Sequence, residues 1–67
     1  MDKWEYRILK IEPKWLNNSY NIDEVELLTT INLLGSDGWE VISTEASVAA
    51  ASQGIDYLYV FLKRKRN

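Results

Sequence analysis

The stretch from Leu33 to Ile42 constrains the fold most, because a helix stops there and a strand starts a few residues later. Apolar side chains recur at helical spacing over residues 27–34. Gly35 follows directly and fits a left-handed C-cap, since glycine takes positive φ without steric cost. We therefore expect a helix that ends at Leu34 and a strand that begins at Trp39.

The start of this helix is also marked. Asn21 fits an N-cap whose side chain accepts from free amides, and Glu24 three residues later completes a capping box. Tyr20 and Val25 would form the accompanying hydrophobic staple. Leu33 lies outside the apolar stripe and is interpreted either as a tolerated exposed leucine or as part of a contact with another subunit.

Three segments have the alternation of strands. Residues 4–12 alternate until Ile8 and Leu9, where the pattern slips and predicts a bulge, strong twist or two-sided burial. Pro13 ends this strand. Residues 39–44 form a second strand, and residues 55–63 a third that is apolar on both faces.

A strand apolar on both faces belongs in the middle of a sheet. The predicted fold class is therefore α+β: a single compact βαββ domain over residues 1–67, with a three-stranded mixed sheet of order 1-3-2 and one helix on one face. The first and second strands would be parallel across a right-handed crossover, and the third antiparallel to both.

Two segments are interpreted as loops. Residues 13–20 contain Asn17, Asn18 and Ser19, which favour turns. Trp15 in this segment is interpreted as a lid over one end of the core, with an exposed binding anchor as the alternative. Residues 46–54 are small and uncharged, which favours a mobile hairpin loop or a short helical turn.

Composition restricts how such a chain is stabilised. It has 67 residues, no cysteine and no histidine, which excludes disulfides and the usual zinc sites. Its hydrophobic content of 46% is too high for a disordered chain. Chains this small usually need a disulfide, a bound metal or a partner subunit for stability. We therefore expect a homodimer or a higher homo-oligomer.

Charge is unevenly placed. Residues 1–62 hold four basic and ten acidic side chains, whereas residues 63–66 are all basic and form the start of a basic C-terminal tail, 63–67. The longest apolar run, Tyr57 to Leu62, is far below the roughly 20 residues of a membrane span. No export signal is evident, so we expect a cytoplasmic protein that does not enter the membrane.

No residue set indicates an enzyme. Neither a nucleophile and base pair nor a metal set is present, and the glycines at 35 and 38 follow a helix, where its dipole repels phosphate. We therefore predict no catalytic residues, no metal ligands and no cofactor.

Three motifs stand out along the chain: Trp4-Glu5-Tyr6-Arg7, Leu33 to Val41, and Phe61-Leu62-Lys63-Arg64. Together they resemble a family of short bacterial and phage proteins, domain-of-unknown-function family 4177. The family pattern runs W-E-Y-K, then L-N-x-L-G-x-x-G-W-E, then F-K-R. The chain departs from it at Arg7 and at the extra Leu62. The resemblance implies a compact βαββ fold and brings no catalytic residue.

The preferred function is a small non-enzymatic binding protein that self-associates through the sheet face its helix leaves uncovered. A phage-type inhibitor of a host protein and a small-nucleotide scavenger are narrower hypotheses within it. The alternative is a single-stranded nucleic-acid-binding protein, less favoured because the body is acidic. The candidate interface residues are Trp4, Tyr6, Trp15, Trp39, Tyr57, Tyr59 and Phe61. The candidate loop contacts are Ser47, Ser52 and Gln53, and the candidate anion contacts are Lys63, Arg64, Lys65 and Arg66.

Overall fold

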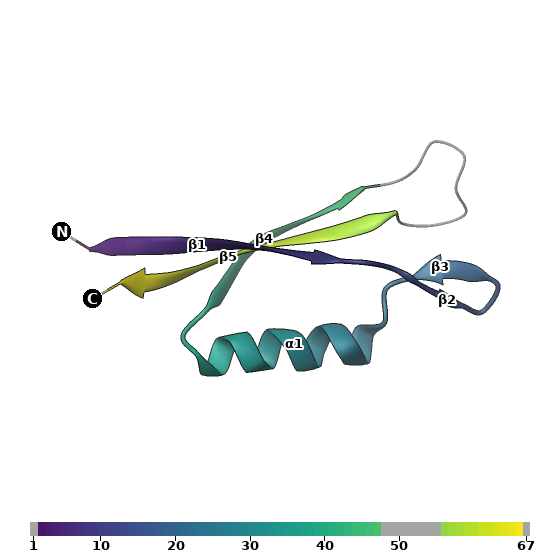
Figure 1. The fold of residues 1–67 in the computed structure, drawn as a ribbon, viewed down its shortest axis with the longest axis horizontal. Coiled ribbons are helices and arrows are strands. Elements are labelled where there is room, and N and C mark those ends of the chain that lie inside the picture. The colour runs from purple at the N-terminus through teal and green to yellow at the C-terminus, as the bar shows by residue number, and fades with distance from the viewer. Residues whose placement is uncertain (1, 48–55, 67) are drawn as a thin grey trace.

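The computed structural model describes residues 2–47 and 56–66. Along the chain it contains β1 (Lys3–Ile11), β2 (Lys14–Leu16), β3 (Ser19–Asn21), α1 (Glu24–Ser36), β4 (Glu40–Ser47) and β5 (Tyr57–Arg66). Figure 1 shows β1 and β5 running along the long axis, with α1 as a separate layer beside them.

The main sheet has the order β1-β5-β4, and β5 is antiparallel to both neighbours. The predicted three-stranded mixed sheet of order 1-3-2 is wrong, because the described chain forms two sheets and the pairings of the main sheet are not mixed. The described chain has five strands, and the main sheet contains antiparallel pairings alone. Although β1 and β4 run in the same direction, they do not touch, because β5 lies between them.

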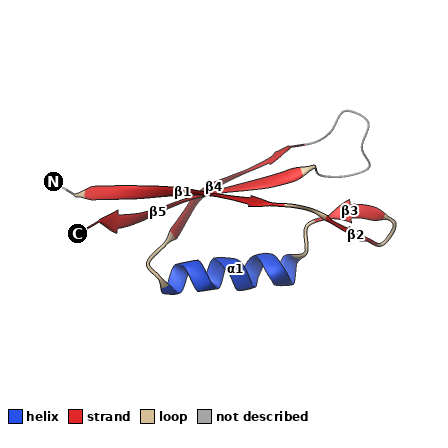
Figure 2. Ribbon diagram, in the orientation of Figure 1, coloured by secondary structure: helices blue, strands red, loops and turns tan. Residues whose placement is uncertain are grey.

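The predicted compact βαββ unit is also corrected. The Cα radius of gyration is 14.1 Å, whereas a compact chain of this length has about 11 Å. The principal extents are 48, 23 and 11 Å, so the molecule is long and thin. The long strands of the main sheet and the separate β2–β3 hairpin account for this shape (Figure 2).

The hairpin occupies a segment that sequence composition assigned to a loop. Trp15 pairs with Tyr20 across it. Asn17 and Asn18 connect the strands with φ of 53° and 65°. Two consecutive residues with positive φ form the mirror-image turn that matches strand twist, and asparagine tolerates it.

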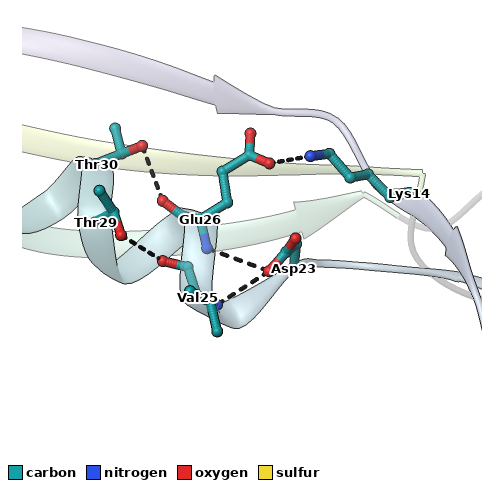
Figure 3. Close-up of polar contacts among 6 residues, drawn as sticks. All are labelled: Lys14, Asp23, Val25, Glu26, Thr29 and Thr30. Atoms are coloured by element: carbon teal, nitrogen blue, oxygen red, sulfur yellow. Dashed lines mark hydrogen bonds and ion pairs between the residues drawn. The ribbon is translucent and has the colours of Figure 1, made fainter.

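The helix begins two residues later than the sequence predicted. Asp23, not Asn21, is the N-cap, and its carboxylate accepts hydrogen bonds from the amides of Val25 and Glu26 at 3.1 and 3.2 Å (Figure 3). Asn21 is engaged elsewhere: its side-chain amide donates to the hydroxyl of Ser19 in the hairpin. Either residue could cap the helix by its type. Asn21 is part of the hairpin, so the cap is Asp23.

An ion pair between Lys14 and Glu26 connects β2 to the first turn of α1 (Figure 3). The hydrogen bond to Glu26 raises the pKa of Lys14 above its ordinary 10.5. A raised base pKa stabilises the fold below the unfolded-state value, so this contribution is present at neutral pH and is lost as pH rises above about 10.5. Both side chains are exposed, which keeps the contribution small.

The end of the helix and the start of β4 also differ from expectation. Gly35 lies inside α1, which continues to Ser36. In the turn after the helix it is Gly38 that takes a positive φ, at 90°. No bulge occurs in β1, whose register against β5 is regular. The irregularity lies in β4, between Val41 and Ser43, and it puts these two residues on opposite faces of the sheet.

The core is small and centred on β5. Val60 and Leu62 are 0% and 1% exposed and are the fully buried side chains of the described residues. The helix turns Leu27, Ile31 and Leu34 toward this side, where each is half-buried. Because the core depends on so few side chains, each of them should affect stability strongly.

Replacing Leu62 with alanine should lower the free energy of unfolding by about 2 to 4 kcal/mol, since a buried leucine is removed from a core that cannot easily collapse. Urea unfolding followed by tryptophan fluorescence measures it. Leu33→Ala, at an exposed helix position, is the matched control and should change the value by less than about 0.5 kcal/mol. Equal effects of the two variants would contradict the assigned core.

Replacing Asp23 with alanine should cost about 1 kcal/mol, because the amides of Val25 and Glu26 lose their acceptor. Asp23→Asn should retain most of the stability, since asparagine is an equally good cap. Thermal unfolding of both variants measures the difference. If both variants lose the same stability, the side-chain cap is not the cause.

Candidate functional site

Strand alternation and register divide the main sheet into two faces. On β5, Leu58, Val60 and Leu62 point toward α1, because Val60 and Leu62 are buried and Leu58 shares a depression with Leu27 of the helix. Residues of odd number on β5 therefore point away from α1. Their cross-strand partners lie on the same side.

We call this second side the open face. It is made by Trp4, Tyr6, Ile8 and Lys10 of β1, by Tyr57, Tyr59, Phe61, Lys63 and Lys65 of β5, and by Glu40, Ser43, Glu45 and Ser47 of β4. Five of the seven predicted interface residues are brought together here: Trp4, Tyr6, Tyr57, Tyr59 and Phe61. The described residues place no helix or strand over this face, since α1 lies on the other side of the sheet.

Large apolar side chains on the open face remain accessible. Trp4, Tyr6 and Ile8 are 39%, 69% and 64% exposed. The aromatic residues of β5 beside them are half-buried. Ile8 pairs directly with Phe61, so the two form the middle of the face. Contiguous exposed apolar surfaces of this kind are typical of interaction sites in proteins.

Lysines lie over the aromatic rings of this face. The Nζ atom of Lys63 is 4.3 Å from the ring centroid of Trp4, and that of Lys10 is 4.0 Å from that of Tyr57. Ammonium groups at these distances are attracted by the ring quadrupole. Sequence reasoning did not single out Ile8, Lys10 or Glu45, although the alternation of residues 4, 6 and 8 already placed Ile8 beside Trp4 and Tyr6.

The charges of the open face are separated by strand. The cations Lys10, Lys63 and Lys65 lie on β1 and β5, whereas Glu40 and Glu45 lie on β4. One long edge of the face is thus acidic and the rest is basic. This separation gives the face a direction across its width, which a uniformly charged surface would not have.

The four predicted anion contacts do not form one cluster. They continue β5 and pair with the first residues of β1. Alternation puts Lys63 and Lys65 on the open face and directs Arg64 and Arg66 to the opposite one. The cations of the chain end are therefore divided between two surfaces.

Arg64 holds one end of the helix side of the sheet together. Its Nε donates to Oε1 of Glu5 at 2.5 Å, and its Nη1 donates to Oδ2 of Asp37 at 2.8 Å. The hydrogen bond to Glu5 raises the pKa of Arg64, with the charges of Glu5 and Asp37 adding to it. One side chain thereby connects β5, β1 and the turn after α1.

Trp39 belongs to this arginine cluster and not to the open face. The guanidinium carbon of Arg64 is 4.6 Å from its ring centroid, and that of Arg7 is 5.6 Å away. Its indole Nε1 is buried and donates to no group in the described part of the chain. Trp39 therefore lies within cation–π distance of two arginines.

The remaining predicted contacts lie elsewhere. Trp15 is 58% exposed in the separate hairpin, so the lid interpretation is wrong, and its ring meets Tyr20 edge-on at 5.0 Å between centroids. Ser47 ends β4 and accepts a backbone hydrogen bond from Asp56. Ser52 and Gln53 lie outside the described residues.

The described residues also limit the chemistry. Among them, no group of three or more acidic, histidine or cysteine side chains is placed to hold a metal ion. A shallow depression beside Arg64 is lined by Glu5, Asp37, Lys65 and Arg66. Its two carboxylates are both paired with Arg64, and Lys65 is paired with Asp2. None of the described helices is both long enough and apolar enough to cross a membrane.

A protein-family model matches most of the chain. The model of a family described as "Domain of unknown function (DUF4177)" matches residues 4–65, which include the hairpin, the helix and β4, all but the first residue of β1 and all but the last residue of β5. No curated protein and no solved structure matches the chain. The open face lies within the matched residues.

Replacing Arg64 with alanine should lower the melting temperature more than Arg66→Ala, which removes an exposed cation from the same face. Arg64→Lys should recover only part of the loss, because a lysine cannot bond Glu5 and Asp37 with the fixed fork of a guanidinium. Thermal unfolding at low and high salt measures these differences. Equal melting temperatures for the Arg64→Ala and Arg66→Ala variants would contradict the role of Arg64 as a connector.

Proposed function

The chain belongs to the DUF4177 family, and we propose that it is a non-enzymatic interaction protein that binds a second copy of itself through the open face. The observation that carries this proposal is the contiguous apolar surface of β1 and β5, centred on Ile8 and Phe61. The helix protects only the opposite face.

The surface area of the molecule supports the proposal. The structure exposes 5264 Å², whereas a compact monomer of 7.8 kDa exposes about 4400 Å² by the usual scaling. The excess is close to the roughly 800 Å² that each partner buries in a standard protein interface. An isologous dimer closed through one face would remove this excess.

The small core supports it as well. Two side chains, Val60 and Leu62, are fully buried among the described residues. Folded chains of this size without disulfides or metals commonly obtain further burial from a partner subunit. If a second copy covered Ile8, Phe61 and their aromatic neighbours, the sheet would have a buried apolar layer on each of its two faces.

Light scattering at micromolar concentration should give twice the 7.8 kDa mass of the chain. Ile8→Glu should shift the protein to monomer, because it places a carboxylate at the centre of both buried faces of the dimer. Ile8 is exposed in the single chain, so the variant should still fold, which circular dichroism checks.

Leu33→Glu is the matched control for this experiment. It makes the same kind of change at an exposed position on α1, which lies on the other side of the sheet. The proposal expects a dimer for this variant. A monomeric wild-type protein, or a Leu33→Glu variant that dissociates while Ile8→Glu does not, would refute association through the open face.

Single-stranded nucleic acid is the second candidate for the same face. Its support is the placement of Lys10, Lys63 and Lys65 among aromatic rings, since base stacking beside cations is how sheet-based single-strand binders work. The acidic edge formed by Glu40 and Glu45 disfavours a polyanion there.

Fluorescence anisotropy with labelled single-stranded oligonucleotides at low salt distinguishes the two candidates. Self-association predicts no binding by the dimer, because the aromatic rings are covered. Binding that weakens steeply with salt and is lost on Lys63→Glu would support the nucleic-acid candidate instead.

A further inference from the structure

The register of the main sheet determines how two open faces fit together. We call the residues that pair with one another across β1, β5 and β4 a row. The row that passes through Tyr59 has Lys10 on β1 and Glu45 on β4. The row through Phe61 has Ile8 on one side and Ser43 on the other. The Tyr59 row thus runs from a cation on β1 to an anion on β4, whereas the Phe61 row is uncharged and apolar on β1.

We propose that the two copies pack face to face about a two-fold axis parallel to β5, so that β1 of each copy lies over β4 of the other. This inference rests on the proposed self-association and adds the geometry of the partner. Rotation about such an axis exchanges the two edges of the sheet and keeps every residue in its row. Lys10 of one copy therefore meets Glu45 of the other, and the symmetry makes this pair twice.

The dimensions of packed sheets allow this contact. Two sheets pack about 10 Å apart, with their strands aligned within about 30°. A lysine and a glutamate that extend from opposite sheets can meet across that gap. At the centre, Ile8 and Phe61 of both copies form the apolar part of the interface, and the ion pairs lie beside it as a polar rim.

The other face-to-face arrangement is electrostatically unfavourable. A two-fold axis perpendicular to the strands would lay β4 of one copy on β4 of the other. With the Phe61 row at its centre, that rotation brings Glu45 opposite Glu40 of the second copy. Like charges in apposition destabilise an interface and exclude the wrong partner orientation. The charged groups of the open face are Glu40, Glu45, Lys10, Lys63 and Lys65. In the first arrangement Lys63 and Lys65 face their own counterparts across the axis, each beside an acidic residue of its own chain, Glu40 and Asp2. Only this arrangement places Glu45 opposite a cation.

Charge exchange tests this geometry. Lys10→Glu creates two contacts between glutamates at the interface, and Glu45→Lys creates two between lysines. Each single variant should raise the dissociation constant of the dimer about tenfold or more at low salt. The double variant, which exchanges the two charges, should return close to the wild-type value.

An equimolar mixture of the two single variants tests the proposed contact most directly. In a heterodimer of Lys10→Glu with Glu45→Lys, both contacts join a glutamate to a lysine, so mixing two weakly associating proteins should restore the dimer. Sedimentation equilibrium measures each sample, and circular dichroism of the separate variants verifies that both fold. A Lys65→Glu variant, changed at the end of the strand, serves as the control. Mixing it with the Glu45→Lys variant should not restore the dimer.

The outcomes separate the two levels of the proposal. A monomeric wild type refutes the proposed self-association itself. A dimeric wild type whose single variants are unaffected, or whose mixture is not restored, overturns the orientation alone. A Glu45→Lys variant that associates more tightly than wild type would also overturn it, because the new lysine would then face Glu40 in the perpendicular arrangement.

Discussion

The central strand β5 is the part of the structure on which everything else depends. It supplies the fully buried Val60 and Leu62 of the described core and pairs on both edges with another strand. Both properties follow from one run of residues that is apolar on both faces. The helix contributes cover, with Leu27 and Leu34 half-buried, but it supplies no fully buried side chain. The helix therefore packs against a core that the sheet supplies.

A single helix can cover one face of a sheet, and this leaves the second face of β5 to be covered by something else. The chain partly shields that face with its own lysines, since Lys63 and Lys10 extend over Trp4 and Tyr57. Such stems cover apolar carbon while the charged ends stay in water. The same lysines can turn toward acidic groups of a partner at little cost, because cation–π contacts at exposed sites are worth only about 0.5 to 1 kcal/mol.

The sequence predicts helices and strands better than it predicts the turns, caps and bulges at their ends. The strands near both chain ends and the helix follow from periodicity, because periodicity reports which residues share a face. The hairpin does not follow from composition, because Asn17 and Asn18 are typical of any loop, although two such residues between short segments also fit a mirror-image turn. The bulge at Ile42 leaves no mark in the sequence, since Val41 and Ser43 fit alternation whether or not a residue is inserted. The cap at Asp23 was missed because local motifs do not say that Asn21 is already bonded in the hairpin.

The candidate site was predictable where it depends on period two within a strand, and not where it depends on neighbours across strands. Tyr57, Tyr59 and Phe61 could be grouped from spacing, whereas the position of Trp39 between Arg7 and Arg64 requires the fold. Charge shows the same limit. Counted along the chain, the basic residues at the end look like one cluster, but strand alternation divides them between two faces. What remains on the open face is an acidic edge on β4, lysines on β1 and on the central strand β5, and an apolar middle at Ile8 and Phe61. A polyanion would be attracted to one side and repelled by the other, whereas a second copy turned about β5 satisfies both.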